Sequence, residues 1–236
     1  RSYTVTSDQE LGGVNFGNNT LLRNFEITDY WYSQDGIGVH PAGSEVVYNI
    51  GTDSYIGAED GLVLATKYYI KQATEITSLR VMLGSGTLPG GWVFGSIKDT
   101  LTFMQGNMTS LWEADPINIT AADTINGYVD LIFPGGAFLA PGTYYAAAEL
   151  YSNSSTSPIN VLDDQTVTQP AMASAIYIPG DQTYTNGESI AIRMLQEDCP
   201  GFSVNTLNQK NACFGLTDGS ILVDAIGSNG TPSYLW

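Results

Sequence analysis

Cysteine, histidine and basic residues are scarce in this sequence of 236 residues. It has two cysteines, one histidine, and 8 Lys and Arg against 24 Asp and Glu, which gives a formal net charge of −16. Nucleic acids and anionic bilayers attract surfaces rich in Lys and Arg, so this balance argues against both as partners. One histidine and two cysteines also cannot complete a closed zinc site of nitrogen and sulfur ligands.

Long apolar runs are missing as well. No stretch of the sequence approaches the roughly 18 apolar residues that cross a membrane as a helix, so we expect no membrane insertion. Residues 1–6 lack the apolar core of a signal peptide and there is no starting Met, which suggests a mature or excised segment. Hydrophobic residues nevertheless make up 43% of the chain, which supports a folded core and excludes wholesale disorder.

The two cysteines, Cys199 and Cys213, lie close together in the sequence. A disulfide between them, closing the loop from Cys199 to Cys213, would stabilise the fold by about 3 kcal/mol. The alternative is a pair of unrelated buried thiols. Charged residues are few, at 14%, and Tyr, Thr, Ser and Asn are abundant, so we favour an exported protein with a Cys199–Cys213 disulfide.

Apolar and polar residues alternate with a period of two through much of the chain, which predicts β-strands. The clearest segments are Gly61–Lys71, Ile76–Leu83, Tyr128–Phe133, Thr143–Tyr151 and Ser189–Leu195. A strand with one apolar face must lay that face against another sheet. Glycine and proline punctuate the segments at short, regular intervals, as in sandwiches and jelly rolls. The predicted fold is therefore all-β, a jelly-roll-like β-sandwich.

Helical periodicity is absent apart from Thr120–Asp123, where we expect a single helical turn, and Pro134–Gly136 is expected to break a strand. The alternation ends near Glu197–Gly201, which predicts one domain over residues 1–197 and a second over residues 198–236. Residues 1–43 are less regular. A separate domain that small would struggle to bury a core, so we expect this segment to supply the opening strands of the same sandwich.

Catalytic residues are hard to assemble from this sequence. A Ser-His-Asp hydrolase would have to use His40 as its base, but His40 stands beside Pro41 in an irregular stretch, and the chain has no Gly-x-Ser-x-Gly elbow. We predict a surface-loop histidine instead. Glu113 and Asp115 are candidates for glycoside hydrolysis only if their separation suits it, and solvated loop acids are the favoured interpretation. We therefore predict no enzymatic activity.

Two kinds of binding site are open. Calcium prefers carboxylate oxygens clustered in turns, and the candidate ligands are Asp53, Glu59 and Asp60, or Asp163 and Asp164; chance clusters of acids are the alternative. Carbohydrate binding would use exposed aromatic rings as stacking platforms. The candidates for that role are Trp31, Tyr32, Trp92 and Trp112, with core or edge packing as the alternative.

Three segments near the C-terminus form an ordered series: Asn211–Gly215, Thr217–Val223 and Gly230–Trp236. The series resembles the start of the SprB-type repeat, found in gliding adhesins and other large surface proteins of Bacteroidota. It covers only the end of the chain and stops at Trp236, where the repeat normally continues. The resemblance implies that residues 198–236 are the first part of a truncated immunoglobulin-like module, and that the protein is exported by the type IX system to the cell surface.

Two further resemblances point the same way. Gly61–Ile70 and Gly142–Ala146 look like the β-sandwich modules that precede such repeats. The triplets at Asp99-Thr100-Leu101 and Asp123-Thr124-Ile125 are similar to the acceptor for O-glycosylation in Bacteroidota, which makes Thr100 and Thr124 candidate modification sites; chance occurrence is the alternative.

The expected function is that of a non-catalytic adhesive or stalk module in a large secreted or cell-surface protein, with a glycan or another cell-surface molecule as its ligand. The alternatives are a carbohydrate-binding module, or an accessory domain of a secreted hydrolase. A module cut at Trp236 would also leave a strand edge unpaired, which predicts possible self-association by strand addition.

Overall fold

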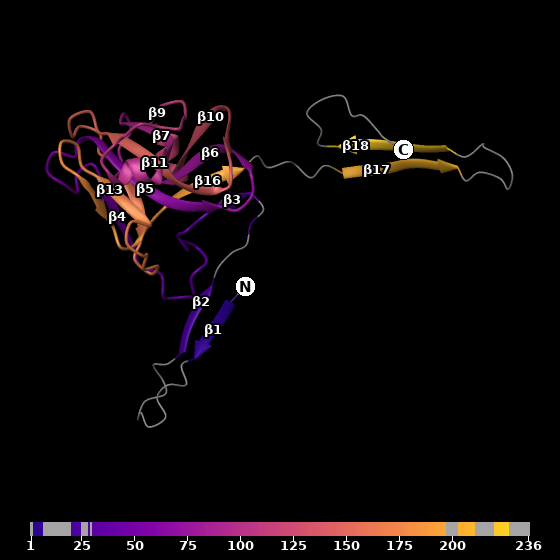
Figure 1. Ribbon diagram of the computed structural model, residues 1–236, viewed down its shortest axis with the longest axis horizontal. Helices are drawn as coiled ribbons and strands as arrows, with labels where there is room; N and C mark the ends of the chain where they lie inside the picture. The colour runs from indigo at the N-terminus through magenta and orange to yellow at the C-terminus, as the bar shows by residue number, and fades with distance from the viewer. Residues whose placement is uncertain are drawn as a thin grey trace, which may run out of the picture. The chain divides into compact units, whose positions relative to one another are not determined.

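The computed structural model describes Ser2–Thr6, Thr20–Asn24, Thr28, Tyr30–Gln196, Ser203–Lys210 and Ser220–Ile226. The chain divides into two compact units, Arg1–Gln196 and Glu197–Trp236, which we describe one at a time (Figure 1). The described residues are mostly strand with two short helices, so the all-β prediction is confirmed. Neither helix is long and apolar enough to cross a membrane.

The larger sheet of the first unit forms one layer of a sandwich. Its strands follow the order β14 (Thr183–Thr185), β13 (Ser174–Tyr177), β5 (Asp60–Ile70), β11 (Gly142–Tyr151), β7 (Trp92–Asp99) and β8 (Trp112–Glu113), with β9 (Ile117–Asn118) also paired to β7. All these pairings are antiparallel. The longest strands, β5 and β11, lie in the interior of the sheet, where both of their edges are hydrogen bonded.

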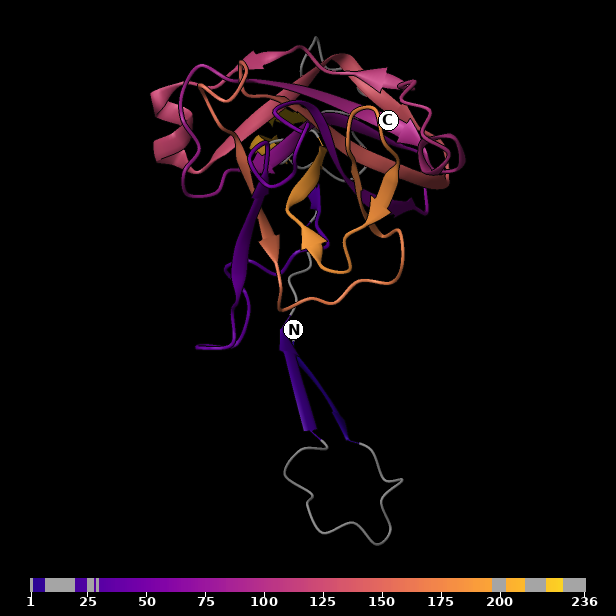
Figure 2. The ribbon, with the colours of Figure 1, turned by 90° about the vertical axis from the view of Figure 1, so that its left-hand side faces the viewer.

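Two smaller sheets make the other layer (Figure 2). The four-stranded sheet has the order β10 (Tyr128–Leu139), β6 (Thr74–Met82), β16 (Ile192–Gln196) and β3 (Trp31–Tyr32). The three-stranded sheet has the order β15 (Ser189–Ile190), β12 (Asn160–Asp164) and β4 (Val47–Gly51). A single β-bridge between Leu83 and Val161 connects the two sheets. Pro134–Gly136 does not end a strand as expected, since it lies within β10 at an irregularity in the pairing with β6.

Residues 1–43 only partly follow the sequence prediction. β3 belongs to the four-stranded sheet, as expected. β1 (Ser2–Thr6) and β2 (Thr20–Asn24) instead pair with each other in a two-stranded sheet. Strands that follow one another in the sequence close a shorter stretch of chain when they pair with each other than when they pair with a distant strand of the sandwich, and this lowers the entropy cost of pairing.

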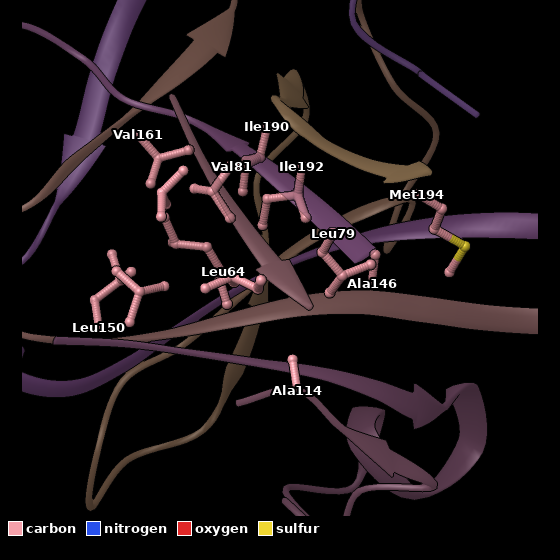
Figure 3. Packing of buried hydrophobic residues seen from close by; sticks show 14 of the residues in the cluster. Leu64, Leu79, Val81, Ala114, Ala146, Leu150, Val161, Ile190, Ile192 and Met194 are labelled. Atoms are coloured by element: carbon pink, nitrogen blue, oxygen red, sulfur yellow. The ribbon is translucent and has the colours of Figure 1, made fainter. Parts of the chain in front are cut away.

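The core lies between the two layers, and the period-two pattern of the sequence supplies it (Figure 3). Leu64 of β5 and Ala146 of β11 come from one layer, and Leu79 of β6 and Ile192 of β16 come from the other; all four are fully buried. The layers are in close contact at Gly95, where an added Cβ would lie 2.8 Å from the Cβ of Leu131 on β10. Burial of the apolar faces of the two layers against each other is the main source of stability in a sandwich.

The large sheet is also covered on part of its outer face. A second apolar cluster there joins Val63, Ala65, Tyr145, Ala147 and Ala175 to Phe103 of helix α1 (Thr100–Met104). The side chain of Asp99 caps this helix by accepting hydrogen bonds from the backbone N–H groups of Leu101 and Thr102. The sequence prediction missed α1, because five residues are too few to show helical periodicity.

The helical turn expected at Thr120–Asp123 is present, but it is the start of a longer helix, α2 (Ala121–Asn126). Thr120 and Asp123 form a capping box, in which each side chain accepts a hydrogen bond from the other's backbone N–H. Gly127 follows with φ at 75°, the left-handed conformation that ends helices and favours glycine.

The second unit contains an antiparallel pair, β17 (Ser203–Lys210) and β18 (Ser220–Ile226). The end of the Thr217–Val223 segment, from Ser220 onward, lies within β18. Cys199 and Cys213 lie outside the described residues, so their disulfide stays a prediction. The immunoglobulin-like character of residues 198–236 also stays a prediction.

Candidate functional site

His40 was expected on the surface of a loop, and this prediction is wrong. Its side chain is only 2% exposed, and its Nε2 lies 2.7 Å from Oδ2 of Asp164, a carboxylate that is fully buried. The same Oδ2 accepts a hydrogen bond from the backbone N–H of Gly36, and Oδ1 accepts one from Thr166. Because the carboxylate only accepts, Nε2 carries the hydrogen and donates it to Asp164.

The histidine ring packs directly on Gly36. A Cβ at that position would lie 2.5 Å from Cε1 of His40, so only glycine leaves room for the ring. His40 Nδ1 is buried and has no hydrogen-bond partner among the described residues. A catalytic histidine needs one ring nitrogen in contact with a nucleophile or substrate, and the other held by an acid. Here the ring instead ties the loop that follows β3 to β12, which is a structural role.

Asp35 and Arg193 form a second buried connection between the same loop and the sandwich. Arg193 of β16 donates from Nε to Oδ2 of Asp35 at 3.0 Å and from its terminal nitrogen to Oδ1. The Asp35 side chain is fully buried and that of Arg193 is 10% exposed. Ser33 also donates its hydroxyl to Asp35, at 2.7 Å. Two-point pairing of this kind offsets the cost of burying both charges.

Arg80 stands beside Arg193 on the outer face of the four-stranded sheet. The two arginines are direct cross-strand partners, and Arg80 is in turn opposite Asp130 on β10. Arg80 donates two hydrogen bonds to Asp130, at 2.8 and 2.7 Å. We call Asp130, Arg80, Arg193 and Asp35 the arginine row. Trp31 lies against this row, with its ring 5.2 Å from the Arg193 guanidinium and 6.0 Å from that of Arg80.

The candidate carbohydrate-binding residues do not form one surface. Tyr32 faces the core, where its ring meets Tyr68 edge-on and its hydroxyl accepts a hydrogen bond from Gln196. Trp31 belongs to the arginine row. Trp112 pairs with Ile97, whose side chain is in the core, so the two project toward the same side of the sheet. Of the four candidates, only Trp92 remains on the outer face of the large sheet, 44% exposed.

Trp92 has partners that the sequence prediction missed. Phe94 is two residues further along β7, on the same face, and is 39% exposed. On β11, Tyr151 is opposite Trp92 and Glu149 is opposite Phe94. The Phe94 and Tyr151 rings meet edge-on with centroids 5.3 Å apart. We call Trp92, Phe94 and Tyr151, together with Glu149, the aromatic patch.

The polar groups of the aromatic patch are linked. Tyr151 donates its hydroxyl hydrogen to Oε1 of Glu149 at 2.6 Å. This hydrogen bond, together with burial and the charges of Glu149 and Asp60, raises the pKa of Tyr151 to about 12, so the phenol stays protonated at neutral pH. The repeated spacing of Trp92 and Phe94, and of Glu149 and Tyr151, was visible in the sequence. That the two pairs are neighbours depends on the pairing of β7 with β11.

The calcium candidates are dispersed. Among the described residues, no group of three or more His, Cys, Asp or Glu side chains comes together in a way that could hold a metal ion. Asp53 is exposed, and Asp60 accepts a hydrogen bond from the backbone of Ser154 at 3.0 Å. Glu59 uses its backbone carbonyl to accept a hydrogen bond from Ser152.

Asp163 and Asp164 do not form a joint site, because successive residues of β12 point to opposite sides of the strand. Asp164 is held by His40, as described above. Asp163 accepts hydrogen bonds from Asn186 at 2.9 Å and Gln165 at 2.6 Å. Burial is the main cause that raises the pKa of Asp163 to about 6, and the nearby charge of Glu188 adds to it.

The candidate modification sites Thr100 and Thr124 both lie in short helices, in α1 and α2. Both threonines are half-buried, whereas the apolar residues that follow them, Leu101 and Ile125, are 70% and 84% exposed. Their modification stays a prediction.

Compared with known proteins, the chain matches no family model, and no curated protein matches it.

Proposed function

We propose that this chain is a non-catalytic adhesive or stalk module of a large secreted or cell-surface protein. The observation that carries the proposal is the aromatic patch, in which the exposed rings of Trp92 and Phe94 lie beside the half-buried Tyr151 on interior strands of a sheet. Solvent-exposed aromatic clusters on a stable scaffold favour a binding role. The sparse charge, the resemblance of Asn211–Trp236 to the SprB-type repeat and the acidic net charge support an extracellular location.

The arrangement of His40 favours binding over chemistry. Its ring is enclosed between Gly36 and Asp164, and its hydrogen bond links two distant segments of the chain. The second candidate function is that of a carbohydrate-binding accessory domain in a secreted hydrolase. The aromatic patch would serve that role equally well, and a catalytic domain encoded in the same gene would favour it.

The proposal is tested with the full purified chain coupled to fluorescent beads. We expect the beads to be retained on surfaces coated with extracellular polysaccharides or with whole bacterial cells, and we expect no release of reducing sugar from the same polysaccharides. Beads coated with albumin are the control. Retention no better than that of the control beads, on every surface, would contradict an adhesive role, and release of reducing sugar would contradict a non-catalytic one.

A further inference from the structure

We propose that the aromatic patch is a binding site for a neutral carbohydrate chain. In this arrangement Trp92 and Phe94 stack on the C–H faces of sugar rings, and Glu149 accepts hydrogen bonds from sugar hydroxyls. The inference rests on the proposed adhesive function and deepens it by naming the site and the class of ligand.

The first argument is the geometry of the patch. Trp92 and Phe94 project from the same face of β7, a strand that is hydrogen bonded to β11 on one side and to β8 and β9 on the other. Alternate residues on one strand are about 7 Å apart, so the Trp92 and Phe94 side chains form a continuous aromatic platform along β7. A platform fixed on both edges loses little conformational freedom when a ligand binds.

The second argument is that, among the described residues, one end of this face is covered and the other end is exposed. Further along β7 on the same face, Ser96 and Lys98 are 7% and 2% exposed. Lys98 donates from Nζ to the backbone carbonyl of Met108 at 2.7 Å and to Ser110 at 3.1 Å, in the segment that follows α1. Among the described residues, the exposed part of this face of β7 is therefore the end that carries Trp92 and Phe94.

The third argument is electrostatic and concerns the nature of the occupant. Glu149 lies in the patch, and Glu113 is opposite Ser96 on the same face of the sheet. Asp60 is close enough for its charge to contribute to the raised pKa of Tyr151. Carboxylates in and around the patch repel sulfated or uronic-acid sugars. They also disfavour a second copy of this chain, whose formal net charge is −16.

A neutral polyhydroxylated ligand avoids this repulsion and matches the hydrogen-bonding groups. Tyr151 uses its hydrogen on Oε1 of Glu149, which leaves the second oxygen, Oε2, to accept from a sugar hydroxyl. A carboxylate is a stronger acceptor than a neutral oxygen, so such bonds favour hydroxylated partners over purely apolar ones. Apolar rings beside a few polar groups that set orientation are the usual composition of a small-ligand site.

The experiment is a titration of the full chain, at pH 7, with soluble neutral polysaccharides (mixed-linkage β-glucan, mannan and xylan) and with alginate as the anionic probe. Binding is followed by calorimetry and by tryptophan fluorescence. We expect at least one neutral polysaccharide to bind and alginate not to bind. Trp92→Ala and Phe94→Ala should each weaken that binding by about tenfold, and Glu149→Gln by about threefold.

The chain offers matched controls for both aromatic variants. Trp112 is 37% exposed but projects toward the other side of the sheet, and Phe138 is 61% exposed on β10, in the other layer. We expect Trp112→Ala and Phe138→Ala to change the affinity by less than twofold. All four variants remove exposed side chains, so thermal unfolding should show intact folding in each.

Several results would overturn the inference. Equal loss of affinity in the patch variants and the controls would place the ligand elsewhere, and tighter binding of alginate would contradict the charge argument. Dimers in light scattering that Trp92→Ala converts to monomers would assign the patch to a second copy. These outcomes leave the adhesive function standing if the coated beads are still retained on cells, whereas loss of that retention as well would remove both.

Discussion

Trp31 and Trp92 both lie on the outer face of a sheet of the same sandwich, yet their surroundings differ. Trp31 packs on two guanidinium groups, and each of these is hydrogen bonded to its own carboxylate. Trp92 has Phe94 and Tyr151 as neighbours on its face, and nearly half of its side chain faces solvent. The charged groups of the arginine row are hydrogen bonded to each other, whereas the aromatic patch leaves the rings of Trp92 and Phe94 exposed.

The comparison shows why the sequence alone does not decide whether a tryptophan has a structural role or binds a ligand. Both residues are tryptophans that begin a strand and lie on the outer face of a sheet. What differs is the set of residues on the neighbouring strands: Arg193 and Arg80 for Trp31, and Tyr151 and Glu149 for Trp92. Charged groups that are hydrogen bonded to each other indicate a structural role, whereas exposed aromatic rings beside a carboxylate indicate a surface for a ligand.

The largest expected effect lies in the arginine row. Arg193→Ala leaves the fully buried carboxylate of Asp35 without its cation, and we expect a loss of about 3–5 kcal/mol in the free energy of unfolding. Arg80→Ala breaks a pair whose members are 22% and 30% exposed, and should cost about 1 kcal/mol or less. Urea unfolding of both variants measures the difference, and similar losses in the two would contradict the assigned burial.

A second test concerns the loop after β3, which contains Asp35 of the arginine row together with Gly36 and His40. Gly36→Ala places a methyl group against the His40 ring, and we expect it to destabilise the fold by about 1–3 kcal/mol in urea unfolding. In a His40→Ala background the ring is gone, so the same substitution should cost less than about 0.5 kcal/mol. A cost that stays the same in both backgrounds would show that the strain lies elsewhere.

Asp163 provides a test that depends on pH. Its pKa of about 6 in the folded chain is above the unfolded value near 3.9, so this group favours folding at low pH and loses that contribution as the pH rises through 6. Asp163→Asn removes the titration. We expect the stability of the variant relative to the parent chain to improve by on the order of 1 kcal/mol between pH 5 and pH 7.5.

Urea unfolding of the parent chain and of Asp163→Asn at the two pH values gives this difference directly. Glu188, whose charge contributes to the raised pKa, offers a matched variant: Glu188→Gln should reduce the pH dependence but not abolish it, because burial is the larger cause. A stability difference between the parent chain and Asp163→Asn that does not change with pH would contradict the raised pKa.

The smallest expected effect compares the two tryptophans directly. Trp31→Ala removes the ring that packs on both arginines and should cost about 0.5–1 kcal/mol of unfolding free energy. Trp92→Ala should change stability by less than about 0.5 kcal/mol, because its ring is exposed. Thermal and urea unfolding measure both. The opposite ranking would show that the aromatic patch is part of the structural framework.

The sandwich was predictable where strands have one apolar face. In Gly61–Lys71 and Thr143–Tyr151, the alternate residues expected to share a face do so in the core. β7 was not predicted, because Trp92-Val93-Phe94 is apolar on both faces and shows no alternation. The outer side of that strand is where the aromatic patch lies, so the missed strand and the missed site have the same cause.

Local sequence determined the strands with one apolar face, the all-β class and the helical turn at Thr120–Asp123, because period-two alternation and capping depend on residues a few positions apart. Only the tertiary structure decided that His40 meets Asp164, that Asp35 meets Arg193, and that Trp92 lies beside Tyr151. These pairs are far apart in the chain. They are selected by strand pairing and by the cost of burying unpaired charge, which no short stretch of sequence contains.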